Sequence, residues 1–170
     1  MERQFVVFVL DNEYYGVDIA LVERIIEVRT IARVPYAPKF IQGVTNLDGA
    51  VLPVVDLRKR FEFAAKPPDR DTRIIVVTAG KTRVGMIVDA VAEVRTIEDA
   101  DIESPPSIVM TVKSKFIAGI AKVRDDQETG TQQVTSDHLI IILNLPNVLS
   151  TREKTDLVTF EEKVTEMSRP

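Results

Sequence analysis

The chain has 170 residues, of which 45% are hydrophobic, enough to bury the core of one domain or of two closely packed halves. Its net charge of −4 argues against a general nucleic-acid binder, and the absence of cysteine excludes disulfides and thiolate sites. No apolar run reaches the roughly 20 residues of a membrane span, and the N-terminus is too polar for a secretory signal. We therefore expect a cytoplasmic protein.

The first half predicts short strands around one helix. Residues 5–10 are β-branched and aromatic, which indicates a strand, and an extended pattern resumes over 14–19. Asp18 is a typical N-cap, so we expect a short helix over 19–28. Four apolar residues fall on one face of this predicted helix: Ile19, Val22, Ile25 and Ile26.

The next segment predicts a β-hairpin. Two apolar stretches, FIQGVTNL and AVLPVVDL, flank Asp48 and Gly49. Asp-Gly suits a two-residue type I′ turn, because both positions need a positive φ. Asp48 therefore has two interpretations: a turn residue, or a charge that a partner recognises. A polar, proline-containing linker over 66–73 follows.

After the linker the pattern restarts. The stretch IIVVTAGKTRVGMIVDAVAEV aligns without a gap on FVVFVLDNEYYGVDIALVERI, with Gly85 on Gly16. FIAGIAKV then echoes FIQGVTNL, and HLIIILNLPNVL echoes AVLPVVDLRKRF, which indicates an internal duplication. Each half is too small to bury a core alone. We expect a mainly β fold of two small barrels around a shared core, roughly residues 5–66 and 74–149, with an exchange of terminal strands left open.

Two polar segments lie outside this repeat. Residues 124–137 are expected to form an exposed loop in the second hairpin. Residues 151–170 form a charged tail beyond the domain of residues 1–150, and both a short docked helix and a frayed end remain open for it. Four apolar residues of the tail recur at helical spacing: Leu157, Phe160, Val164 and Met167.

No set of residues in the sequence suggests catalysis. The single histidine, His138, opens an apolar strand and is interpreted as a strand-end residue. Asp99 and Asp101 lack the spacing of a calcium loop, and phosphate-binding glycine motifs are absent. We therefore expect a protein-binding module with no enzymatic activity, no metal and no cofactor, and only measured turnover would support a small β-barrel enzyme instead.

The motifs YGVDI, P-x-F-I-x-G-V-x-N-L-x-G and P-V-V-D-L occur in order, and from Gln4 to Leu149 the chain resembles the CheW family of bacterial chemotaxis coupling proteins. The resemblance implies two five-stranded SH3-like barrels with short helices. It implies a scaffold that links the cytoplasmic tips of methyl-accepting chemoreceptors to the regulatory domain of the histidine kinase CheA, recruited to membrane receptor arrays without inserting into the membrane or binding nucleic acid. A stand-alone CheW-like regulatory module of a non-motility kinase pathway is the alternative.

Carried over by residue, the resemblance places a receptor-binding surface at Val22, Arg24, Ile25 and Asp48, and a contact with the kinase at Ile108. Core packing explains Val22 and Ile25 equally well. The family's common turn is NLRG, where this chain has NLDG, and the family commonly has an acid where Arg24 stands. We hypothesise that Arg24 and Asp48 face each other as an acid–base pair of reversed polarity.

Overall fold

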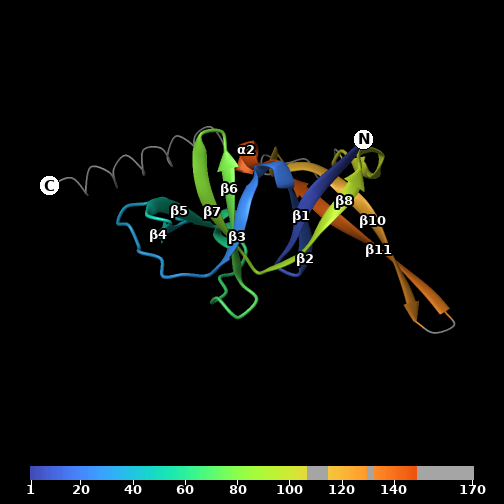
Figure 1. Cartoon of the computed structure of the whole chain (residues 1–170), viewed down its shortest axis with the longest axis horizontal. Helices are drawn as coiled ribbons and strands as arrows, with labels where there is room; N and C mark the ends of the chain where they lie inside the picture. Colours follow the sequence, from blue (N-terminus) through green and yellow to red (C-terminus); the bar gives the residue numbers. More distant parts are fainter. Residues whose placement is uncertain (107–114, 130–131, 149–170) are drawn as a thin grey trace.

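Two β-sheets lie side by side in the computed structural model, each curved into a small barrel (Figure 1). The structure describes residues 1–106, 115–129 and 132–148. The expectations for Ile108 and for the tail over 151–170 lie outside the described residues. No helix among the described residues is long and apolar enough to cross a membrane.

Barrel 1 is the six-stranded sheet, with the strand order β8-β1-β2-β11-β10-β9. Its strands are β1 (Glu2–Leu10), β2 (Glu13–Asp18), β8 (Ala90–Glu98), β9 (Ile102–Glu103), β10 (Ile117–Thr129) and β11 (Gln132–Leu143). Neighbouring strands are antiparallel except β2 and β11, which are parallel.

Barrel 2 is the five-stranded sheet, with the order β3-β6-β7-β5-β4 and a parallel pair formed by β5 and β7. Its strands are β3 (Val22–Glu27), β4 (Ile41–Leu47), β5 (Ala50–Asp56), β6 (Arg73–Ala79) and β7 (Thr82–Val88). Short helices lie between the strands at η1 (Ile19–Leu21), α1 (Leu57–Arg60) and η2 (Asp99–Asp101), and α2 (Leu145–Val148) follows β11.

The strand registers reproduce the sequence repeat, but the two halves exchange their first hairpins. Barrel 1 combines β1 and β2 of the first half with β8 to β11 of the second, and barrel 2 combines β6 and β7 with β3 to β5. Equivalent residues have equivalent partners: Gly16 pairs with Val7 and Ile142, and Gly85 with Val76 and Val54. Because each barrel needs strands from both halves, neither half forms a barrel alone.

The largest core cluster draws on both barrels, which confirms the predicted shared core. Phe8 and Leu10 of β1 and Met86 of β7 are fully buried in it, as are Leu57 and Leu145, the first residues of α1 and α2. Complete burial of one such side chain contributes about 1.5–3 kcal/mol to folding. The two short helices thus cap the core at positions that the repeat makes equivalent.

The predicted helix over 19–28 is wrong beyond its first turn. The Asp18 carboxylate accepts a hydrogen bond from the amide of Ala20 at 2.9 Å, so the predicted N-cap exists, but η1 ends at Leu21 and β3 follows. The apolar residues of β3 are β-branched and favour a strand, and β3 gains backbone pairing with β6.

The predicted loop over 124–137 is also wrong. Strands β10 and β11 continue beyond the barrel as a paired hairpin, with Arg124 opposite Asp137 and Thr129 opposite Gln132 (Figure 1). A backbone ladder that starts inside the barrel propagates outward with each added pair, and threonine and valine residues in this stretch favour strands.

Candidate partner-binding surface

Strand β3 forms one edge of barrel 2 and contains a β-bulge. The register with β6 shifts between Val22 and Arg24, so Glu23 has no pairing residue in the neighbouring strand. A bulge bends the strand and re-aims its side chains. Glu23 is exposed as a result, and the Arg24 side chain, 38% exposed, points along the barrel surface to the β4–β5 turn.

The β4–β5 turn has the predicted geometry. Asp48 and Gly49 have φ angles of 53° and 84°, as a type I′ turn requires. The Asn46 side-chain carbonyl accepts a hydrogen bond from the Gly49 amide at 2.9 Å and fixes the turn. The Asp48 side chain is 68% exposed, so nothing in the turn itself uses its carboxylate.

Arg24 and Asp48 form an ion pair, as hypothesised from the sequence. The Arg24 Nη2 donates to Asp48 Oδ2. Because β3 and β4 are the two edges of the sheet of barrel 2, the pair spans the seam between them. The hydrogen bond and positive charge of Arg24 hold the pKa of Asp48 below its ordinary value, so the carboxylate stays ionised at neutral pH.

A second ion pair extends this one into a row of alternating charges. Glu23 accepts two hydrogen bonds from Arg83, both at 2.6 Å, which lower the pKa of Glu23. Glu23 also lies 4.0 Å from the Arg24 guanidinium. We call Arg83, Glu23, Arg24 and Asp48 the charged row. Exposed pairs of this kind contribute little to folding, so the row is a candidate for recognition.

The two apolar residues of the predicted surface differ in exposure. Val22 is partly buried and packs against the shared core, so its packing interpretation holds. Ile25 is 39% exposed and lies next to Arg24 on the same edge strand. Arg24 and Ile25 thus lie on the edge strand β3, and the ion pair brings Asp48 of the β4–β5 turn to Arg24 across the seam. Sequence reasoning missed Glu23 and Arg83, which are 60 positions apart.

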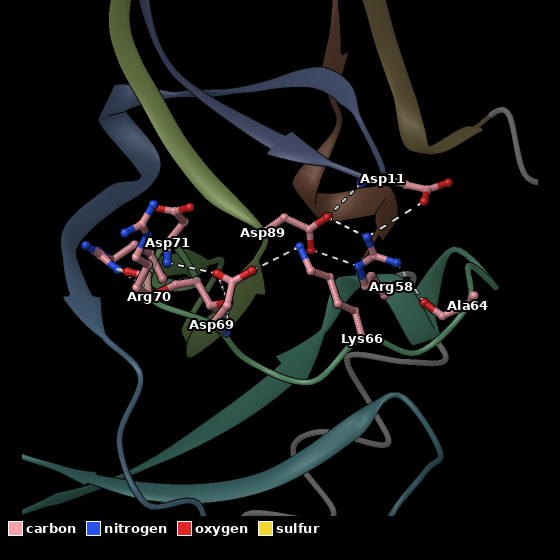
Figure 2. Close-up of polar contacts among 10 residues, drawn as sticks. Asp11, Arg58, Ala64, Lys66, Asp69, Arg70, Asp71 and Asp89 are labelled. Carbon is pink, nitrogen blue, oxygen red and sulfur yellow. Dashed lines mark hydrogen bonds and ion pairs between the residues drawn. The ribbon is translucent and has the colours of Figure 1, made fainter.

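A second polar cluster, which the sequence did not suggest, joins the two barrels (Figure 2). Asp56 caps α1 by accepting from the Arg58 amide at 3.0 Å, and this cap positions the Arg58 side chain. Arg58 donates to both carboxylate oxygens of Asp89, at 2.8 and 2.6 Å, and Asp89 also accepts from the Asp11 amide at 2.9 Å. We call Arg58, Asp89 and Asp11 the inter-barrel clamp.

The clamp joins three parts of the fold. Arg58 belongs to α1 of barrel 2, Asp11 to the β1–β2 turn of barrel 1, and Asp89 to the crossing from β7 to β8. Arg58 also donates to the Ala64 carbonyl at 2.7 Å, which fixes the chain just before the linker. The Arg58 and Asp89 side chains are only 12% and 14% exposed, so the pair is shielded from water.

The residues with other chemistry are dispersed. The His138 ring lies 5.0 Å from the Tyr14 ring, and Asp99 and Asp101 lie in η2. Among the residues whose side chains the structure describes, no group of three or more histidine or acidic side chains is placed to hold a metal ion.

Comparisons with known proteins agree with this architecture. The family model of the CheW-like domain matches residues 4–153. The chain is 30% identical over 151 residues to the chemotaxis protein CheW of Klebsiella aerogenes, covering 89% of this chain and 84% of that protein. It is 34% identical over 120 residues to that of Bacillus subtilis, covering 71% and 77%.

A solved structure is similar over nearly the whole chain. The crystal structure of the scaffolding protein TtCheW from Thermoanaerobacter tengcongensis matches with a TM-score of 0.75 and 37% sequence identity, covering 90% of this chain and 91% of that one. The predicted fold class, two SH3-like barrels around a shared core, is thereby confirmed.

Proposed function

The chain belongs to the CheW family, and we propose that it is a non-enzymatic coupling protein that links chemoreceptor tips to the regulatory domain of the kinase CheA. The observation that carries this proposal is the match of the barrel pair to a scaffolding protein over nine-tenths of both chains. Residues 1–150 would form the coupling domain and 151–170 a separate charged tail. The protein would act in the cytoplasm, at membrane receptor arrays.

We place the receptor contact on the β3 edge of barrel 2. Ile25 supplies an exposed apolar side chain, and Arg24 and Asp48 supply fixed charges beside it. Protein interfaces combine an apolar centre with a polar rim in this way, and the charges select the partner while the apolar contact holds it. Val22, at the start of the same strand, is partly buried and packs against the core.

Replacing Ile25 with alanine is expected to weaken receptor binding by about fivefold to tenfold, the loss typical of an apolar interface residue. Titration calorimetry with a purified receptor hairpin would measure it. The control is Val94→Ala, because Val94 is the repeat equivalent of Ile25 on β8 and is 53% exposed. Equal binding by the parent and both variants would contradict this receptor surface. Kinase binding without any receptor binding would instead favour the stand-alone regulatory module.

The second contact, with the kinase, is proposed at Ile108 on the resemblance alone. Ile108→Ala is expected to weaken association with the CheA regulatory domain by about fivefold, equivalent to about 1 kcal/mol. The amount of the Ile108→Ala variant that co-sediments with reconstituted receptor–kinase arrays should fall as well. An affinity for the kinase domain equal to that of the parent chain would show that Ile108 makes no kinase contact.

A further inference from the structure

An apolar hollow lies where the segment after α1 of barrel 2 meets the strands of barrel 1. Its volume is about 170 Å³. Four aromatic residues line it: Tyr15 of β2, Phe61 and Phe63 just after α1, and Phe116 just before β10. The rest of the lining is apolar and comes from residues 117, 141 and 143 of β10 and β11. Because its lining among the described residues carries no charge, the hollow suits an apolar occupant.

The aromatic rings of the hollow are only partly covered by one another. Phe61 stacks on Tyr15 with ring centres 6.1 Å apart, and its ring lies 5.9 Å from that of Phe116 and 6.0 Å from that of Phe63. Tyr15 and Phe116 are buried, whereas Phe61 and Phe63 remain partly exposed. An apolar cavity of about 150 Å³ is large enough to bind benzene. The hollow therefore has room for one further aromatic side chain.

The last described residue, Val148 at the end of α2, lies close to this hollow. Its carbonyl oxygen accepts a hydrogen bond from Arg60 Nε at 3.0 Å, and the Arg60 guanidinium lies 4.3 Å from the centre of the Phe116 ring. The Asn147 side chain also donates to the Lys115 carbonyl at 2.9 Å, which fixes α2 to the segment before β10. A single side chain, that of Arg60, thus connects the end of α2 to the lining of the hollow.

The sequence that follows Val148 supplies a suitable apolar face. Within residues 149–170, apolar residues recur at the spacing of one helical face: Leu157, Phe160, Val164 and Met167. An isolated helix of this length is marginal in water, so its stability depends on packing of that face. Residues 149–156 span up to about 26 Å when extended, which is enough to bring the apolar face to the hollow.

We propose that the hollow is the docking site of the chain's own C-terminal segment, residues 151–170. The segment binds as an amphipathic helix, and Phe160 inserts among the rings of Phe61, Phe63 and Phe116. Insertion of this kind combines apolar burial with favourable ring–ring contacts, as when an amphipathic helix binds in an apolar groove. The proposal goes beyond the coupling function and does not depend on it, because the hollow and the segment both belong to this chain.

Tryptophan fluorescence of the full-length chain tests the docking, because the chain has no tryptophan of its own. Phe63→Trp places one indole in the lining, where the docked segment shields it from the quencher acrylamide. Adding Phe160→Glu is expected to lower the ratio of docked to free segment by about tenfold or more, since the burial of one phenylalanine side chain is lost, and quenching should rise.

The matched control is Val158→Glu in the same Phe63→Trp background. It makes the same charge change two residues away, on the opposite side of the helix from the apolar face, so quenching should stay as in the parent. Thermal unfolding unchanged from that of the natural chain verifies that all three variants keep the fold. Equal quenching in the Phe160→Glu and Val158→Glu variants would overturn the proposal.

Disulfide formation tests the contact directly, because the chain has no cysteine of its own. The pair Phe63→Cys/Phe160→Cys should close an intramolecular disulfide under mild oxidation much faster than the pair Phe63→Cys/Val158→Cys, since only the first brings its Cα atoms within bonding range. Equal rates would overturn the proposal. A disulfide between two chains would overturn it in favour of a second copy's segment. An indole at position 63 that is shielded only after a receptor hairpin or the CheA regulatory domain is added would overturn it in favour of that partner.

Discussion

Replacing Asp89 with alanine is expected to lower the free energy of unfolding by about 3 kcal/mol, since it leaves the shielded Arg58 guanidinium with only the longer ion pair to Asp11, at 3.7 Å. Removing one member of a buried pair costs more than the pair contributes, because the remaining charge keeps its desolvation penalty. The same change removes the acceptor for the Asp11 amide at the β1–β2 turn. Urea denaturation at neutral pH would measure the loss.

The control for this prediction is Asp99→Ala. Asp99 is another aspartate near the surface of barrel 1, but its side chain is 47% exposed and it only reaches Arg3 at 3.9 Å. Its removal should change stability little, as for most exposed pairs. Replacing both Arg58 and Asp89 with leucine should lower the free energy of unfolding by less than the sum of the losses caused by the two single replacements. If Asp89→Ala behaves like Asp99→Ala, the clamp does not stabilise the fold.

The clamp also predicts how stability depends on pH. Burial raises the pKa of Asp89, but the hydrogen bonds from Arg58 and from the Asp11 amide outweigh burial, and the net pKa lies below the ordinary value of 3.8. A carboxyl whose folded pKa is depressed stabilises the fold above its unfolded pKa and loses that contribution as the pH falls through the folded one. The stability difference between the parent and Asp89→Ala should therefore be complete at neutral pH and shrink on acidification below about pH 4.

The local sequence sufficed to predict the β4–β5 hairpin, and alignment of the two halves sufficed to predict the duplication. The Asp48-Gly49 pair specifies its turn by backbone geometry alone, and the matching glycines of the repeat recur at matching ladder positions. The prediction of a helix over 19–28 failed because apolar residues spaced three and four apart suit both a helical face and a bulged strand. Pairing with β6, which begins at Arg73, decided the outcome, and no local signal contains that information.

The inter-barrel clamp could not be predicted because it arises from the exchange of hairpins. The repeat equivalents of Arg58, Asp89 and Asp11 are Pro146, Ala20 and Gly80, so the second crossing has no such cluster and the repeat gives no hint of the first. The Arg24–Asp48 pair could be predicted because both residues differ from those that the family commonly has at these positions. No such difference pointed to Glu23 and Arg83.

The charged row leads to the last prediction, which concerns partner choice. Within barrel 1 the repeat equivalents of Arg24 and Asp48 are Glu93 and Arg124, so the fold accommodates either polarity at these positions. The family's common turn has an arginine where Asp48 stands, so turn geometry does not demand the acid. In the folded chain Arg24 and Asp48 neutralise each other, and Glu23 lies beside them. Reversing one charge alone places like charges next to one another on the proposed receptor surface.

A cycle of Arg24→Glu, Asp48→Arg and the double exchange should therefore change receptor selection far more than stability. Each single change is expected to weaken binding to the protein's own receptor by about tenfold to a hundredfold, since like charges at an interface cost up to several kcal/mol. The double exchange restores the polarity of the family's common NLRG turn, so it should gain affinity for a family-typical receptor tip while losing it for its own. Calorimetry against both tips would measure the cycle, with Lys81→Glu as the control for net charge. If all three variants bind both tips like the parent, Asp48 serves the turn alone and the row selects no partner.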